Sequence, residues 1–464
     1  MTRPIPLSTV AAVLALLAMP ARAGTIQVSS GLGADLQAAI DAAAPGDTIQ
    51  LSGGPYFGDF VIPAGRDGLT LKGKATIDSP DNFAPFTVDS NDVTFQALTF
   101  RHARSAVIAG PDLAAPPLAG FTLKQCTFLD VRGNSAVIVE ADDALITGCV
   151  FESCVGGLFL TGDRITVTKC KVLNDNGALG INVEGDEATV LKCTLAVTEG
   201  DGISIIGDAA LVSGNKLANV GGQGIDVDGS GATVTGNTVT GATLSGLIVV
   251  GDGAEVSKNR VSFCADVGVH VFGETIHVSG NRVEQMLAGG RGYLVESTSD
   301  ALVEGNLAQN VADEGFDLDL SGGHVLQNKA IHCGVGDNVD SGFALTISGS
   351  QIENNVASRC STAGFRIEGT ANLIQGNIAT SNRNNGFLIA GLTTVGTLMT
   401  GNTAKGNGGE GIQNGGVTTV LQDCTSTGNL LDIANETADG ASLVDDGGNV
   451  FKTGGLTTEP LVDE

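Results

Sequence analysis

The segment 203–268 contains three consecutive stretches of 22 residues that share one pattern, ISIIGDAALVSGNKLANVGGQG, IDVDGSGATVTGNTVTGATLSG and LIVVGDGAEVSKNRVSFCADVG. Each stretch has an alternating apolar run, a glycine turn, a second run centred on Val and Asn, and a second turn. Apolar residues at every second position predict short strands with one inward face, and no stretch shows the 3.6-residue period of a helix. The repeat therefore predicts a solenoid of short stacked strands.

The same register extends back to about Ala106 and forward to about Asp432, and one column holds either Cys or Asn in every coil. The column consists of Cys126, Cys149, Cys170, Cys193, Asn215, Asn237, Asn259, Asn281, Asn306, Asn328, Asn355, Asn377, Asn402 and Cys424. Asn tolerates turn geometry and can pass side-chain hydrogen bonds from coil to coil, so the column predicts an internal ladder. About fourteen coils at roughly 4.8 Å each predict a rod on the order of 70 Å long.

The two ends of the chain differ from the repeat. Residues 1–23 have the basic Arg3, a short apolar core and small residues before Gly24, which predicts a signal peptide and export to the extracellular space or the periplasm. Residues 24–464 are expected to form one β-helix domain. It has an N-terminal cap at about 24–46 with a short helix over Ala34–Ala43, regular coils at about 47–432, and a C-terminal cap with an acidic tail at about 433–464.

Composition restricts the class of partner. The chain has 464 residues, of which 67 are Gly, with no Trp and only 2 Tyr. Acidic residues outnumber basic ones by 51 to 24, and the formal charge of −27 argues against a nucleic-acid partner. No apolar run after the signal peptide approaches membrane-spanning length, so we expect no membrane insertion. The glycine content indicates many tight turns.

Nine cysteines in an exported chain would usually suggest disulfide bonds. Five of them stand in the ladder column, and the other four each follow a ladder residue by five positions, namely Cys154, Cys264, Cys333 and Cys360. Both columns are expected to face the interior, where a free thiol packs as a small apolar group. We therefore predict buried thiols, with a bridge between Cys333 and Cys360 as the alternative.

The chain resembles right-handed parallel β-helix proteins of the pectin-lyase-like superfamily. The resemblance rests on LQAAIDAAAPGDTIQLSGGPYFGDFVI at 36–62, on the G-[ILFV]-x-[VIL] repeats and on the Asn column. It implies an all-β, single-stranded right-handed parallel β-helix with a short N-terminal capping helix. The superfamily includes lyases, hydrolases, epimerases and non-catalytic proteins, so the resemblance does not select a reaction.

In the enzymes that the chain resembles, catalysis takes place on the outer face of the strand before the Gly-Asp turn. Asp317 and Asp319 occupy that face here, an extended loop after them adds Asp337 and Asp340, and the preceding turn adds Asp313 and Glu314. Carboxylate oxygens are suitable calcium ligands, so these six acids could surround Ca²⁺, with Asp317, Asp319, Asp337 and Asp340 as the candidate ligands. The alternative is that acidic residues on an acidic protein simply cover solvated turns.

Candidate catalytic residues are Asp317, Asp319, Arg291 and His332, because the arginine and histidine are expected on loops near the two aspartates. Mutual repulsion would raise the pKa of some carboxyl groups and make one of them suitable for acid or base chemistry. The resemblance implies a lyase arrangement, in which a metal ion neutralises a uronate carboxylate and a base removes the C5 proton.

Candidate substrate-binding residues are Arg260, Arg282, His270 and Glu296. The two arginines belong to a basic column directly after the ladder, whose members are Lys171, Lys216, Arg260, Arg282 and Lys329. This column is either a track for an acidic polymer or a set of charges that offsets the acidic turns.

Two functions fit the sequence. The first is a secreted protein that binds or processes a polysaccharide, with a uronate-containing polymer as the favoured substrate, calcium as the candidate cofactor, and a lyase or epimerase reaction. Glycoside hydrolysis is disfavoured because the polygalacturonase signatures NTD, GHG and RIK are absent. The alternative is a non-catalytic extracellular rod with a structural, adhesin-like or scaffold role, which the outward apolar residues and the lack of Trp favour.

Overall fold

The computed structural model describes residues 23–29, 32–79, 84–110, 117–175, 179–287, 289–335, 340–435 and 442–452. Apart from Ala23, the predicted signal peptide lies outside these residues, as does the end of the acidic tail. Within the described residues, no helix is long and apolar enough to cross a membrane.

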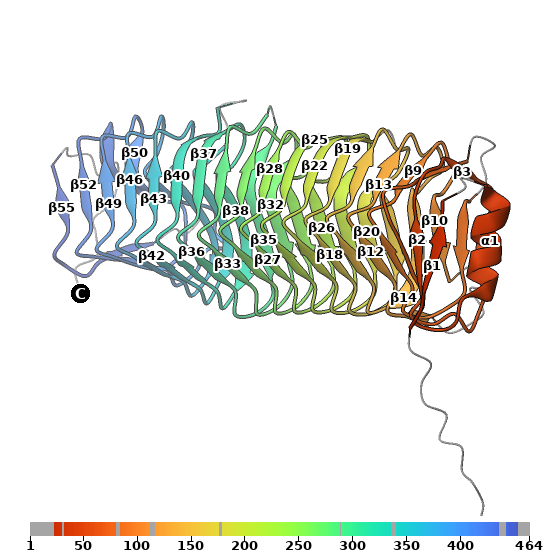
Figure 1. Cartoon of the computed structure of the whole chain (residues 1–464). Coiled ribbons are helices and arrows are strands. Elements are labelled where there is room, and N and C mark those ends of the chain that lie inside the picture. Colours follow the sequence, from red (N-terminus) through yellow and green to blue (C-terminus); the bar gives the residue numbers. More distant parts are fainter. Residues whose placement is uncertain are drawn as a thin grey trace, which may run out of the picture.

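Each coil of the solenoid contributes one strand to each of three parallel sheets. In a typical coil, β23 (Asp201–Ile206) belongs to sheet C, β24 (Leu211–Ser213) to sheet A and β25 (Lys216–Val220) to sheet B. The next coil repeats this order, and its first strand, β26 (Ile225–Asp228), pairs in parallel with β23. The coils stack into the rod shown in Figure 1, which confirms the predicted right-handed parallel β-helix.

The number of coils is larger than fourteen. Among the described residues, sheet A contains 19 strands, from β1 (Thr25–Val28) to β54 (Leu443–Asp445), and the β-helix has about 18 turns. The earliest coils escape the Cys and Asn count because the position before their sheet B strand holds a buried Ala75 or Leu98 instead. At the other end, β54 and β55 (Val450–Phe451) continue sheets A and B.

A single helix, α1 (Gly33–Ala42), covers the N-terminal end of the rod, as Figure 1 shows. Its Leu36 and Ile40 are fully buried against the first coil. The Gln37 side chain donates to the Val61 carbonyl at 3.0 Å and accepts from the Val61 amide at 3.0 Å, on the edge strand β4 (Phe60–Ile62). The predicted capping helix is therefore confirmed, and it satisfies polar groups of an edge that would otherwise be unpaired.

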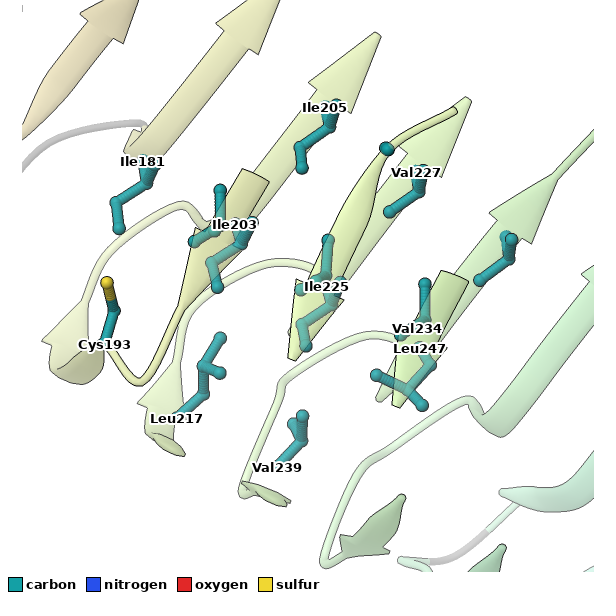
Figure 2. Close-up of a cluster of buried hydrophobic side chains, with 14 of the residues drawn as sticks. Ile181, Cys193, Ile203, Ile205, Leu217, Ile225, Val227, Val234, Val239 and Leu247 are labelled. Atoms are coloured by element: carbon teal, nitrogen blue, oxygen red, sulfur yellow. The ribbon is translucent and has the colours of Figure 1, made fainter. Parts of the chain in front are cut away.

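In the interior, residues of the same kind stack at the same position in successive coils. Figure 2 shows Ile203, Ile225 and Leu247 in one such column, and these three residues pair in register. The Asn column forms the expected ladder, because the Asn237 amide nitrogen Nδ2 donates to Asn259 Oδ1 at 3.0 Å and to the Val212 carbonyl at 2.9 Å. The same pattern repeats from Asn215 to Asn402, so these buried amides are hydrogen-bonded.

All nine cysteines are buried free thiols, as predicted, and Cys333 and Cys360 form no bridge. The column that contains Cys360 continues as a second Asn ladder, in which Asn382 Nδ2 donates to Asn407 Oδ1 at 3.0 Å and Asn407 Nδ2 to Asn429 Oδ1 at 2.9 Å. Cys and Asn therefore occupy the same buried position in different runs of coils in both columns.

The few aromatic side chains lie mostly inside the rod. Behind sheet C, the rings of Tyr293, Phe316 and Phe343 stack with centroids 4.6 Å apart, and Phe365 and Phe387 extend the stack. Both tyrosines are fully buried. The aromatic residues thus support stacking between coils and leave few rings on the surface.

Candidate functional site

The candidate site lies on the outward face of sheet C. The strands concerned are β32 (Val267–Phe272), β35 (Arg291–Ser297), β38 (Phe316–Ser321), β41 (Phe343–Ser348) and β44 (Phe365–Thr370). Strand alternation aligns two outward columns across them. The first column is His270, Leu294, Asp317, Ala344 and Arg366, and the second is Phe272, Glu296, Asp319, Thr346 and Glu368.

Arg291, the first residue of β35, lies among three carboxylates. Its Nε is 3.4 Å from Glu314 Oε2 and 3.6 Å from both Asp313 Oδ2 and Asp317 Oδ2. The backbone holds this arrangement, because the Gly292 amide donates to the Glu314 carbonyl at 2.8 Å and the turn before β38 thereby lies over the start of β35. The predicted neighbourhood of Arg291 and Asp317 is therefore present in the structure.

Burial dominates the electrostatics of these groups. It raises the pKa of Asp317; Arg291 opposes the rise, while Glu314, Glu296 and Asp319 add to it. The pKa of Arg291 lies above its ordinary value, because the three carboxylates outweigh the lowering by burial. Asp317 is half-buried, whereas Asp319 is exposed and acts on Asp317 through its charge. Asp317 is consequently a stronger base than a fully solvated carboxylate.

A cation could be held beside Arg291 by Asp313, Glu314 and Asp340, whose carboxylate oxygens lie within 4.8 Å of one another. The pKa of Asp313 is raised by burial and by a hydrogen bond that its protonated form donates to Asp340, and that of Glu314 by burial and by a hydrogen bond with Asp313. These three carboxylates repel one another, and binding of a proton or of Ca²⁺ would relieve the repulsion.

The predicted calcium ligands are therefore only partly together. Asp340 belongs to the three-carboxylate set, whereas Asp317 contacts Arg291 and Asp319 points outward from sheet C. Asp337 lies outside the described residues. Asp313 and Glu314, which the sequence also placed around this coil, come from the turn before β38, and the stacking of coils brings this turn close to Asp340.

His332 and His270 have different partners. His332 is the last residue but one of β40 (Lys329–Cys333) in sheet B. It is exposed and places Nδ1 2.8 Å from Asn310 Oδ1 in the preceding coil. It makes this contact instead of facing Asp317. His270 lies on sheet C, with Nε2 3.2 Å from Glu296 Oε2, so these two predicted binding residues do form one pair next to Asp317.

Arg260 and Arg282 lie on a different face from His270 and Glu296. Both arginines belong to sheet B, where they contact the same acid, Glu284; Arg260 Nη2 is 2.8 Å from Glu284 Oε2. The predicted substrate-binding set is thus divided between sheet B and sheet C.

Sequence reasoning gave no site role to two features of this face. Phe272 is 50 % exposed and lies in register with Glu296, so an aromatic ring is available beside the acidic residues. Arg366 and Glu368 form an ion pair two coils beyond Asp317 and Asp319. The alternation along each strand shows that these residues point outward. Which of them lie next to one another depends on how the coils stack.

The fold and this face are those of a β-solenoid with an outward row of polar residues. The family model "Right handed beta helix region" matches residues 118–261, 201–352 and 245–403, which together cover more than half of the chain. The chain belongs to this right-handed β-helix family. A search of curated protein sequences finds no match.

Solved structures with this fold include a double mutant of the tailspike protein of E. coli bacteriophage HK620, with 11% identity over 74% of each chain and a TM-score of 0.50. Another mutant of that tailspike, in complex with a pentasaccharide, matches with 13% identity over 74% of this chain and 73% of that chain, also at 0.50. A mannuronic acid specific family 6 polysaccharide lyase from human gut microbiota matches at 13% identity and a TM-score of 0.37, over 66% and 83% of the two chains. At these identities the tailspike matches establish a shared fold.

Proposed function

We propose that the protein is exported, that it binds a uronate-containing polysaccharide along the outward face of sheet C, and that it processes this polymer as a lyase or epimerase at the coil of β38. The observation that carries the proposal is the half-buried Asp317, whose pKa is raised by burial and which lies beside Arg291. A carboxylate with a raised pKa is a stronger base than an ordinary one, and removal of the C5 proton of a uronate requires a base.

The neighbouring charges suit the same substrate. Loss of a proton next to a carboxylate builds negative charge on the sugar, which a cation must offset. Arg291 is one such cation. Ca²⁺ held by Asp313, Glu314 and Asp340 would be a second one, and it would also release Arg291 from two of its three carboxylate contacts.

Binding along the rod is supported by Phe272 and by the His270–Glu296 pair, which lie within two coils of Asp317 on the same face. An exposed ring can pack on the apolar face of a sugar, and the polar side chains can bond to its hydroxyl groups. A tailspike mutant with the same fold is known in complex with a pentasaccharide, which supports a sugar-binding role for a protein of this fold.

The test compares wild-type protein with Asp317→Asn on alginate, polygalacturonate and a neutral glucan, each with Ca²⁺. Formation of unsaturated sugars is followed by absorbance, and C5 inversion by NMR. We expect Asp317→Asn to reduce the rate by about 100-fold or more, the usual effect of removing a general base. Asp226→Asn is the matched control, because Asp226 occupies the same column four coils away and its pKa is also raised by burial.

Retention of full activity by Asp317→Asn would contradict the assigned site. Binding of a polymer without any product, by wild-type protein as well, would favour the second candidate, a non-catalytic polysaccharide-binding rod. The exposed apolar side chains of Ile206 and Phe272 on sheet C support that candidate, because they offer contact area without chemistry.

A further inference from the structure

A strip of exposed basic side chains runs along the corner between sheets A and B, away from the candidate site on sheet C. We define this basic strip as Lys169, Lys171, Lys192, Lys216, Lys258, Arg260 and Arg282. The sheet B strands below it are β19 (Lys171–Asp175), β22 (Thr194–Thr198), β25, β28 (Thr238–Thr240), β31 (Arg260–Ser262) and β34 (Arg282–Glu284). They belong to six consecutive coils, and Figure 1 shows β19, β22, β25 and β28 side by side.

The register aligns the sheet B members of the basic strip. Lys171, Thr194, Lys216, Thr238, Arg260 and Arg282 follow one another as direct partners in this order. At about 4.8 Å per coil, the column is roughly 24 Å long and parallel to the axis of the rod. A linear polymer that lies along the axis would therefore meet a cation at least once in every two coils.

Three lysines at the corner between the two sheets extend the strip toward sheet A, and their backbone conformation is strained. Lys169, Lys192 and Lys258 have φ values of 56°, 54° and 55°, a region that glycine occupies without strain and that costs other residues about 1 kcal/mol. The next coil has glycine at this corner after Lys192, and a Cβ built on Gly214 would lie 3.6 Å from Lys192 Cγ. The lysine stems thus extend along the corner over the following coil.

The strip is nearly free of acidic groups on a protein whose net charge is −27. The second outward column of the same strands is Leu173, Ala196, Ala218, Thr240, Ser262 and Glu284. Its one acid, Glu284, has a side chain only 13 % exposed and is held by Arg260 and Arg282. The two arginines therefore retain a net positive charge toward the solvent.

The sheet A side of the corner adds hydroxyl groups. The outward column next to the lysines contains Thr168, Ser213, Thr235, Ser257 and Ser279, with only Leu191 between them. Alternating hydroxyls and cations complement a chain that itself carries both hydroxyls and regularly spaced anions. An acidic polysaccharide has this chemistry.

We propose that the basic strip is a second polysaccharide-binding surface, which holds a linear acidic polysaccharide parallel to the rod axis. It lies on a different face from Asp317 and requires no reaction there, so the inference goes beyond the proposed function. Its role is to retain a polymer of which another part can reach sheet C. Because the groups are exposed, the attraction is expected to weaken as salt increases.

The test measures binding of fluorescently labelled polygalacturonate oligomers by anisotropy, at low and at physiological ionic strength. We expect Lys171→Glu/Lys216→Glu to weaken binding by about tenfold at low salt, since two exposed attractions become repulsions. Lys74→Glu/Lys405→Glu is the matched control: it changes the net charge equally, both lysines are exposed, and neither belongs to the strip. Circular dichroism and thermal midpoints verify that all variants are folded.

A charge-conserving variant shows whether the effect depends on the positive charges. Lys171→Arg/Lys216→Arg should bind like the wild type, because the charges remain. Unchanged binding by Lys171→Glu/Lys216→Glu, or absence of binding by the wild type at low salt, would overturn the proposal. Tighter binding of a single-stranded oligonucleotide than of polygalacturonate would overturn the assignment to a polysaccharide.

Discussion

Asp313 has both a cation and other acids as neighbours. Arg291 Nε is 3.6 Å from its Oδ2, and carboxylate oxygens of Asp340 and Glu314 lie within 4.8 Å of an Asp313 carboxylate oxygen. Burial and Asp340 raise its pKa, and the attraction to Arg291 does not cancel this effect. The folded protein therefore binds a proton at Asp313 more readily than the unfolded chain does.

The pH dependence of stability follows from this direction. A carboxyl group with a raised pKa contributes full stability below its ordinary pKa of about 4, and this contribution is lost as the pH rises through the folded value. We expect Asp313→Asn, which stays neutral, to have a higher thermal midpoint than the wild type at neutral pH. The difference should disappear toward pH 4.

Calcium provides the control for this prediction. At neutral pH, Ca²⁺ should raise the midpoint of the wild type and have a much smaller effect on Asp313→Asn, which lacks one ligand. Differential scanning calorimetry over a pH series, with Ca²⁺ or with a chelator, measures both effects. An Asp313→Asn protein that is less stable than the wild type at neutral pH would show that the contact with Arg291 outweighs burial.

At the scale of single elements, the strands of sheet C depend on a glycine that is their second residue or lies directly before them. In successive coils this residue is Gly202, Gly224, Gly246 and Gly268. A Cβ on Gly246 would lie 2.3 Å from Val261 Cγ1 and 2.7 Å from the Gly268 carbonyl oxygen, which belongs to the next coil. Much of the glycine content is thus explained by close approach between stacked coils and by the left-handed corners.

Gly246→Ala is expected to destabilise the protein by about 3 kcal/mol, because the new methyl group overpacks against a backbone carbonyl. Gly236→Ala is the comparison, with a φ of +65° and no atom within 4 Å of the added Cβ. It should cost only about 1 kcal/mol, the strain of a left-handed alanine. Urea unfolding of the two variants measures the difference, and equal losses would show that the coils separate to accept the methyl group.

At the scale of the whole molecule, the ends of the rod determine whether it remains a monomer. Strands inside the rod pair on both sides, whereas the first coil has a free edge that α1 covers. An uncovered edge of a parallel sheet can pair with a strand of another chain. By covering this edge, α1 prevents the rods from associating end to end. The hydrogen bonds of Gln37 to Val61 are part of this cover.

Leu36→Asp/Ile40→Asp places two charges in the contact between α1 and the first coil, where both side chains are fully buried. We expect the helix to detach and the protein to associate through its ends, with a mass that increases with concentration in light scattering. Ala34→Asp, at an exposed position of the same helix, should leave the mass unchanged. A monomeric double variant would mean that the edge is protected in another way.

The amino-acid sequence by itself determined the solenoid, its inward columns, its Asn ladder and its capping helix. These features follow from local rules, because strand alternation and a 22-residue repeat place the same residue type at the same position in every coil. Early coils were missed where Ala75 and Leu98 replace the ladder residue, since an apolar residue at that position has no recognisable signature.

Only the tertiary structure decided which charges meet. Sequence spacing predicted the neighbourhood of Arg291 and Asp317, but it also included His332, which contacts Asn310 instead. It combined Arg260 with His270, although they lie on different sheets. Whether a side chain points inward or outward follows from the alternation along its strand, which has a period of two residues. The partner in the next coil depends on the length of each loop, which sets whether a turn such as that of Asp313 and Glu314 comes to lie beside Asp340.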